Sequence, residues 1–259
     1  EADGSLTTLQ PGGLAHPGGI TLLNGELVVA DLHAIRFFDP ASGEETQVQR
    51  NVLGMGKMGG ALNLSTDNDK LILVSWVDGD IRVWDPVAME VVERHDGLAG
   101  PVAAVRYAGK IIATEHGTNT IIGLDNNGRT QYMSIDAPTG LASSDGSLYV
   151  TSRSEGKIYK IGADNSMLDE PTLVVQGLTD PEGLTIVGDE FVIVQGSDGQ
   201  IVATDPKGEG KTLATIAAGT EAASADQPPS MVFNGVTAMP DGTLYATGET
   251  NRVLYRLTR

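Results

Sequence analysis

One unit of sequence recurs six times along the chain, and this repeat restricts the possible folds more than any other feature. Each copy starts with a small residue followed by an apolar one, as in Pro181-Glu182-Gly183-Leu184. The small residues stand at positions 19, 61, 103, 140, 183 and 235, so successive copies are 42, 42, 37, 43 and 52 residues apart. This spacing is typical of the four-stranded blades of a β-propeller.

Turn signals divide each copy into strands. Three copies carry a hairpin dipeptide before their second β-rich run: Asn24-Gly25, Asp145-Gly146 and Asp241-Gly242. Such dipeptides join antiparallel neighbours. The sequence therefore predicts an all-β, six-bladed β-propeller of four-stranded antiparallel blades. A β-sandwich is the alternative, but a sandwich does not need six copies of one unit.

The two ends of the chain complement each other. The sixth copy reaches Arg259 after only its third strand, whereas residues 5–9 read as an outer strand with no copy of their own. We therefore expect residues 1–259 to form a single propeller domain in which residues 1–15 complete the last blade. Closing the ring in this way removes an exposed sheet edge.

Composition limits the partners. The chain has 34 Asp and Glu residues against 17 Lys and Arg residues, a net charge of −17, whereas a nucleic-acid binder needs an excess of cations. It has no cysteine, which removes disulfides, thiolate nucleophiles and Cys-ligated metal sites. The longest apolar run, residues 71–77, has the length of a strand. We expect a monomer that acts on a small molecule, without nucleic acid or membrane.

The start of the chain bears on its location. An acidic, cysteine-free sequence that opens at Glu1-Ala2-Asp3 fits a mature secreted form. We expect a periplasmic or extracellular protein, with a cytoplasmic location as the alternative.

Two groups of repeats resemble known propellers. Residues 181–184 and 234–247 resemble the NHL and SMP-30/gluconolactonase class of six-bladed propellers, and residues 113–121 resemble a repeat of the virginiamycin B lyase-like propellers. At the level of blades the resemblance covers nearly the full chain. It implies the fold and two kinds of activity, lactone hydrolysis and a lyase reaction.

Polar residues gather at one end of the predicted ring. In a propeller, the start of each innermost strand and the loop between the second and third strands emerge on the same face. The candidates from these positions, which include three of the four histidines, are His16, Glu182, Asn234, Asp31, His33, Trp76, Glu115, His116, Arg153 and Glu249. Loops that converge around a central channel bring such side chains within reach of one small molecule.

The resemblance also implies a metal site. In SMP-30-like lactonases, carboxylate and amide oxygens before the repeat glycine hold a divalent cation, and Glu182 and Asn234 match two such positions. Oxygen ligands suit Ca²⁺ or Mg²⁺. The family pattern needs three or four ligands, however. The sequence departs from this pattern at the other four positions, which are assigned to Gly18, Gly59 or Gly60, Val102 and Thr139.

The leading functional hypothesis is metal-assisted hydrolysis of a small lactone or ester. His116 would act as general base with Glu115 orienting it, and His33 or His16 could replace it. Arg153, Trp76, Asp31 and Glu249 would bind the substrate. The alternatives are a virginiamycin B lyase-like reaction, in which His116 removes a proton from the substrate, and a propeller that binds a ligand or protein without catalysis.

The longest interval between copies contains an insertion. Residues 219–230 are small and polar, include Pro228-Pro229, and directly precede the copy that carries Asn234. Long loops in compact domains are often functional. We predict that this segment partly covers the channel mouth.

Overall fold

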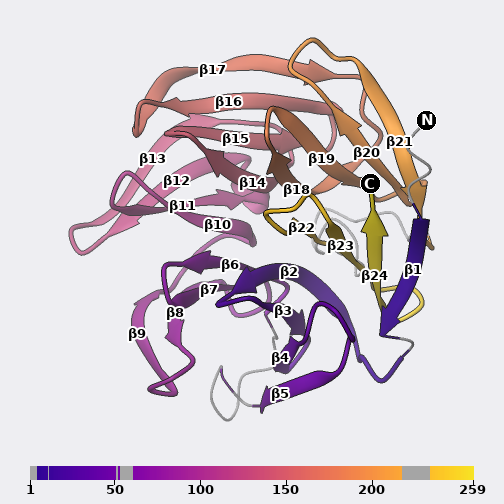
Figure 1. The fold of residues 1–259 in the computed structure, drawn as a ribbon. Coiled ribbons are helices and arrows are strands. Elements are labelled where there is room, and N and C mark those ends of the chain that lie inside the picture. The colour runs from indigo at the N-terminus through magenta and orange to yellow at the C-terminus, as the bar shows by residue number, and fades with distance from the viewer. Residues whose placement is uncertain (1–4, 11, 51, 53–60, 218–233) are drawn as a thin grey trace.

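The computed structural model describes residues 5–10, 12–50, 52, 61–217 and 234–259. These residues form 24 strands in six four-stranded antiparallel sheets around a central axis (Figure 1). Blades 1 and 2 consist of β2 (Pro17–Leu23), β3 (Glu26–Asp31), β4 (Ala34–Phe38), β5 (Glu45–Arg50), β6 (Asn63–Asp67), β7 (Lys70–Ser75), β8 (Asp80–Asp85) and β9 (Glu90–His95). Blades 3 and 4 consist of β10 (Pro101–Tyr107), β11 (Lys110–Glu115), β12 (Thr120–Asp125), β13 (Gly128–Ser134), β14 (Pro138–Ser144), β15 (Ser147–Ser152), β16 (Lys157–Ala163) and β17 (Ser166–Gln176). Blades 5 and 6 consist of β18 (Pro181–Val187), β19 (Glu190–Gln195), β20 (Gln200–Thr204), β21 (Gly210–Thr215), β22 (Val236–Ala238), β23 (Leu244–Gly248), β24 (Val253–Thr258) and β1 (Ser5–Gln10).

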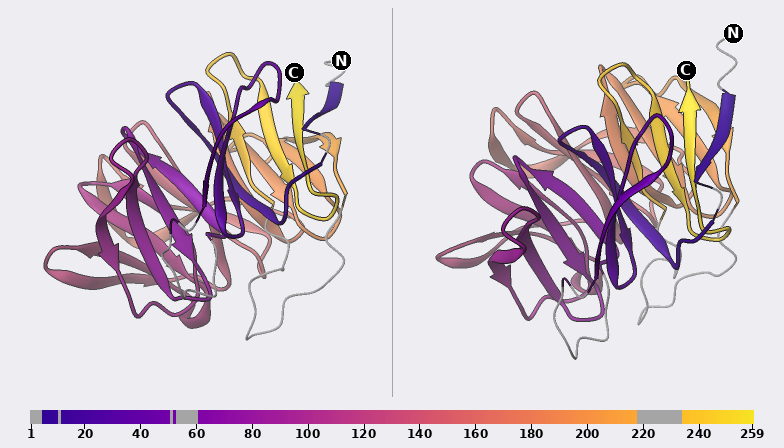
Figure 2. Two further views of the ribbon diagram at one scale, coloured as in Figure 1. Left: turned by 90° about the horizontal axis from the view of Figure 1, so that it is seen from below. Right: turned by 60° about the horizontal axis from the view of Figure 1, so that its bottom comes forward.

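The N-terminal strand closes the ring, as the sequence predicts. β1 lies antiparallel to β24, with Ser5 opposite Thr258 and Leu6 opposite Leu257. Figure 2 shows the two strands side by side from two further directions. The outer edge of β24 is thereby paired, which protects it from association with other strands.

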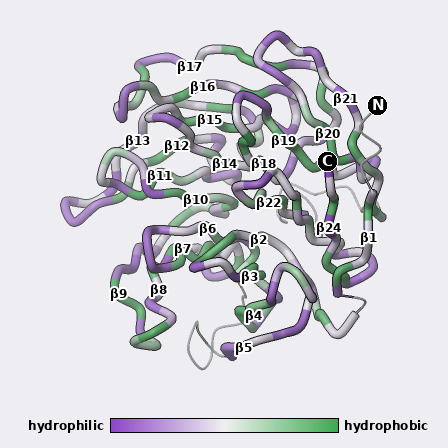
Figure 3. Tube along the Cα trace, in the orientation of Figure 1, coloured by the Kyte–Doolittle hydropathy of each residue, from purple (hydrophilic) through white to green (hydrophobic). Residues whose placement is uncertain are grey.

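The hydrophobic core consists of six clusters, each between two neighbouring blades. Leu71 and Leu73 of blade 2, for example, pack with Val28 and Phe37 of blade 1. The hydrophobic segments of β3 and β7 stand out in Figure 3. The alternating strand residues thus bury both faces of a blade and leave the central axis free for a channel.

A β-bulge marks the start of most inner strands. In blades 1, 3, 4 and 5 the proline of the repeat faces the last residue of the second strand, and the pairing then shifts before the next pair, as between Pro181 and Leu184. Proline is tolerated at the first residue of a strand and at bulges because it donates no ladder hydrogen bond. The Pro-x-Gly pattern of the repeat encodes this bulge.

In blade 2 the start of the inner strand was wrongly predicted. Leu64 faces Leu73 as Ile20 faces Val29 in blade 1, so Asn63, and not Ala61, occupies the small-residue position. Asn63 fits there because its Oδ1 accepts the Leu64 N–H at 2.8 Å. Ala61 instead forms an isolated bridge with Leu32, and Gly59 and Gly60 lie outside the described residues.

Candidate functional site

The inner strands come closest together at the glycines of the repeat. A Cβ on Gly183 would lie 2.8 Å from the Asn234 carbonyl oxygen, and one on Gly235 would lie 2.9 Å from the Cα of Gly19. Glycine is required here by the close approach of neighbouring backbones. We call the end of the ring that carries the predicted site residues the mouth.

Glu182 and Asn234, the two predicted metal ligands, lie side by side. Both are fully buried. Oε2 of Glu182 accepts the backbone N–H of Asn234 at 3.2 Å and faces its amide Nδ2 at 3.5 Å. The other carboxylate oxygen packs against Gly196, where a Cβ would lie only 2.2 Å away. Gly196 thus makes room for the carboxylate of Glu182.

A cation lies beside this buried carboxylate. Nε of Arg153 is 4.0 Å from Oε1 of Glu182, and Nη2 of Arg153 is 3.8 Å from the carboxylate of Asp180. Nε of Arg153 is buried, and among the described residues it has no hydrogen-bond partner. The guanidinium therefore retains a donor for another molecule.

His116 stands near Arg153 and packs against Trp76. The two rings have centroids 5.5 Å apart and are tilted by 52°. Burial lowers the pKa of His116 below its ordinary 6.5, and the charge of Arg153 lowers it further, while Asp136 acts in the opposite direction. Nδ1 of His116 is buried and, in the part of the chain that the structure describes, unpaired. The lowered pKa favours the neutral imidazole at neutral pH, and Nδ1 can bond to another molecule.

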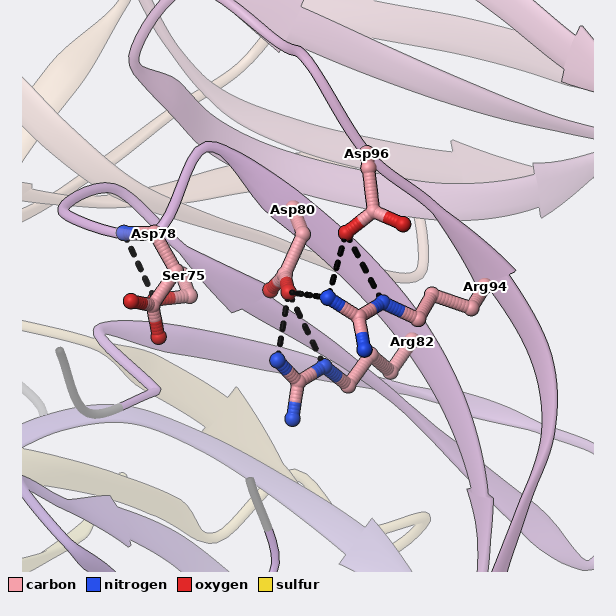
Figure 4. Close-up of polar contacts among 6 residues, drawn as sticks. All are labelled: Ser75, Asp78, Asp80, Arg82, Arg94 and Asp96. Carbon is pink, nitrogen blue, oxygen red and sulfur yellow. Dashed lines mark hydrogen bonds and ion pairs between the residues drawn. The ribbon is translucent and has the colours of Figure 1, made fainter. Parts of the chain in front are cut away.

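The loop that carries Trp76 is fixed by an ionic cluster in blade 2 (Figure 4). Asp80, whose side chain is fully buried, accepts from Nε of Arg82 at 3.1 Å and from Nη2 of Arg94 at 3.2 Å. At the other end of the loop, the hydroxyl of Ser75 accepts the Asp78 N–H at 3.4 Å. Both ends of the Trp76 loop are thereby attached to the blade.

His16 and Glu249 form a second pair at the mouth. Nδ1 of His16 lies 2.6 Å from Oε1 of Glu249, and the backbone N–H of Glu249 donates to Oδ1 of Asn234 at 3.2 Å. The carboxylate is buried, whereas 41% of the His16 side chain is exposed. A carboxylate acceptor at Nδ1 leaves Nε2 as the free ring nitrogen.

The carboxylate of Asp31, a predicted site residue, is bonded within its own blade. Asp31 accepts the backbone N–H groups of Ala15 and His16 at 2.7 Å and pairs with Arg36 at 2.5 Å. The Asp31 carboxylate is therefore part of the scaffold around the mouth.

Glu115 is bonded in a similar way. It accepts the Ala99 N–H at 3.0 Å and the Thr118 hydroxyl at 3.0 Å, and it pairs with Arg129. These contacts hold the start of the inner strand of blade 3, and none of them joins Glu115 to His116. The side chain of His33 is exposed at the end of the blade 1 loop.

Sequence reasoning missed a set of threonines that pin the inner strands. Thr247 accepts the Gly235 N–H at 2.8 Å and donates to the Gly18 carbonyl of the next blade at 2.6 Å. Thr114 does the same for Ala103, at 2.9 Å, and Thr139 of blade 4, at 3.2 Å. The signal was available, because each threonine is the last residue but one of the second strand of its blade. Asp180 and Gly196 were also missed, because Asp180 pairs with an arginine of another blade and Gly196 contacts Glu182 across two strands, and no local sequence pattern marks either contact.

The donor set at the mouth does not fit a divalent cation. Asn234 already uses Oδ1 for the Glu249 N–H, and the guanidinium of Arg153 stands beside Glu182 where a metal would add positive charge. Within the described residues, no group of three or more His, Asp or Glu side chains is arranged to hold a metal ion. The other positions before the small residue are occupied by Gly18, Leu62, Val102 and Thr139. The Thr139 hydroxyl donates to the Pro181 carbonyl oxygen at 2.8 Å, which leaves Glu182 as the single charged ligand at this level.

Comparison with known proteins gives similarity in structure alone. No family model and no curated protein sequence matches the chain. In the described residues, no helix is both long and apolar enough to cross a membrane.

Solved structures similar to the chain include two enzymes and a binding protein. An auxiliary nutrient binding protein from Bacteroides thetaiotaomicron has a TM-score of 0.75 at 12% identity, covering 98% of this chain and 76% of its own. The gluconolactonase XC5397 from Xanthomonas campestris has a TM-score of 0.70 at 17% identity, covering 99% and 90%. Virginiamycin B lyase from Staphylococcus aureus has a TM-score of 0.66 at 15% identity, covering 99% of both chains. The similarity confirms the six-bladed propeller that the repeats imply, and at these identities it is a similarity of fold.

Proposed function

We propose that the residues of the mouth hydrolyse small lactones or esters, with a histidine as general base. Arg153 supplies the positive charge that a metal ion would supply in metal-assisted hydrolysis. The supporting observation is that Nδ1 of His116 and Nε of Arg153 are both buried and have no hydrogen-bond partner among the described residues. Unpaired buried polar atoms are rare in folded proteins and call for an explanation. A substrate that binds both atoms explains them together.

The proposed step needs a base, an oxyanion donor and an acid. The neutral imidazole of His116 removes a proton from water as its oxygen attacks the carbonyl carbon. The guanidinium of Arg153 donates to the oxyanion that forms. The carbonyl–oxygen bond to the leaving alcohol then breaks, and the protonated His116 returns its proton to the leaving oxygen. The product is a hydroxy acid, or an acid and an alcohol.

The similar structures support this proposal at the level of precedent. One is a gluconolactonase, and the other enzyme is a lyase of which an alanine variant at one histidine is described as catalytically inactive. The histidine of the present mouth could remove a proton from carbon instead of water, so a lyase reaction is the second candidate. The unpaired Nδ1 of His116 favours both reactions equally.

A panel of lactones and aryl esters tests the proposal. We expect turnover by the wild-type protein, with incorporation of oxygen from labelled water into the product. His116→Ala should lower kcat/KM by about 10²- to 10⁴-fold, the usual contribution of a general base. His95→Gln is the matched control because His95 lies on β9, bonded to Glu93 and away from the mouth.

Two results would overturn the hydrolase. Turnover without oxygen incorporation would assign a lyase reaction. Saturable binding of the panel without any turnover would assign the mouth to a binding protein.

A further inference from the structure

A cavity lies inside the ring, between the inner strands. It has a volume of about 310 Å³ and is lined by the inner strands of all six blades. Its lining continues along these strands to Thr66, Ser143 and Ile186 and does not include Glu182 or Asn234. His116 and Arg153 are not part of the lining either.

The lining of this cavity is polar but uncharged. In four of the blades, the residue two positions after the small residue carries a hydroxyl and lines the cavity. These residues are Thr21, Ser65, Thr185 and Thr237. No Asp, Glu, Lys or Arg of the described chain lines the cavity. The absence of charge is notable because the whole chain carries 34 acidic and 17 basic residues.

The hydroxyls on the two sides of the channel differ in their partners. In blades 1 and 2 they bond to the protein: Thr21 lies 2.9 Å from the Thr66 hydroxyl, and Ser65 donates to the Ala104 carbonyl at 2.6 Å. In blades 5 and 6, the hydroxyls of Thr185 and Thr237 make no hydrogen bond to any described residue. Thr237 is only 9% exposed, so its hydroxyl has the cavity as its remaining surroundings.

We propose that the channel binds one neutral, polyhydroxylated molecule of monosaccharide size through Thr185 and Thr237. Ligand hydroxyls can both donate to and accept from threonine. The apolar Leu141 and Leu184 of the same lining can cover the carbon skeleton. A charged ligand would lose its hydration without gaining a counter-ion, which makes its burial here unfavourable. The volume lies within the range of small-molecule sites.

Calorimetry with glucose, compared with glucuronate as its charged counterpart, tests this site. We expect saturable binding of glucose. Glucuronate should bind at least about tenfold more weakly than glucose. Thr185→Val with Thr237→Val should weaken glucose binding by about tenfold through the loss of two hydrogen bonds. Thr185→Ser, which keeps the hydroxyl, should retain binding. Thr172→Val on the exposed face of β17 is the matched control.

Several outcomes would overturn the channel site. Glucose that does not bind, or that binds the double valine variant as tightly as the wild type, would leave a cavity filled with water only. Equal affinity for glucuronate would contradict the role of the uncharged lining. Because the proposal is independent of catalysis, His116→Ala should bind glucose normally, and loss of binding in that variant would place the sugar at the mouth instead.

Discussion

His116 and Arg153 differ from the other polar residues of the mouth in what they leave unpaired. Asp31 and Glu115 are bonded to backbone N–H groups and to an arginine, so their carboxylates serve the scaffold. Nδ1 of His116 and Nε of Arg153 are buried and have no hydrogen-bond partner among the described residues, although Nε lies 4.0 Å from Oε1 of Glu182. An unpaired buried group costs about 1–3 kcal/mol. Retaining two such groups at one face is typical of a site that a ligand completes.

The charge of Arg153 should set the pH range of the reaction. A general base works in its neutral form, and burial and Arg153 hold the pKa of His116 below its ordinary 6.5. We therefore expect kcat/KM to rise with pH through a midpoint below 6.5 and then to level off. Arg153→Gln removes one cause of the lowered pKa, so the midpoint should move upward, and loss of the oxyanion donor should reduce kcat/KM by about 10²- to 10³-fold.

The control for this profile is Arg50→Gln, which removes the same charge from the exposed end of β5. Its midpoint should match that of the wild type. A midpoint that stays in place or moves downward in Arg153→Gln would contradict the coupling between Arg153 and His116.

At the level of elements, threonine hydroxyls attach the inner strand of one blade to the next. Thr247 bonds Gly235 in its own blade and Gly18 in blade 1, and Thr114 bonds Ala103 and Thr139. These hydroxyls satisfy backbone groups of the inner strands that lie outside the regular ladder. The position of the mouth residues therefore depends on hydrogen bonds deep in the second strands.

Thr247→Val should reduce the free energy of unfolding by about 1–3 kcal/mol, because it leaves the Gly235 N–H and the Gly18 carbonyl buried without their partner. Urea denaturation measures the change. Thr212→Val on β21 is the comparison, since Thr212 is exposed and bonds only the Gln200 side chain. Equal stability of the two variants would show that the bridge between blades is not stabilising.

The sequence predicts elements better than contacts. Hairpin dipeptides and the Pro-x-Gly pattern define strands locally, so in five of the six blades the predicted small residue has the same place in the inner strand. In blade 2 the small-residue position was predicted wrongly because Gly59-Gly60-Ala61 resembles the repeat pattern. Asn63 occupies that position instead, with its side chain bonded to the Leu64 N–H. The meeting of Arg153 with Glu182 depends on side chains from two blades, which no local pattern encodes. The predicted cover, residues 219–230, lies outside the described residues.

At the scale of the whole molecule, one terminal strand decides whether the ring is closed. β1 pairs along β24 from Ser5 opposite Thr258 to Gln10 opposite Leu254. Deleting residues 1–10 removes this strand and exposes the edge of β24. We expect a lower urea midpoint and association that increases with protein concentration in size-exclusion chromatography. Deleting residues 1–4 is the control, and an equally stable monomer after the longer deletion would contradict the closure account.

The ring as a whole brings the histidines of blades 1 and 3 and the arginine of blade 4 to one end of the channel. In the proposed reaction the positive charge comes from Arg153 and not from a metal ion. The most direct test is the rate of lactone opening at pH 7 by protein treated with a chelator and then dialysed. We predict that the wild-type rate survives this treatment and is lost in His116→Ala. A rate that disappears with chelation and returns with Ca²⁺ or Mg²⁺ would contradict the central claim.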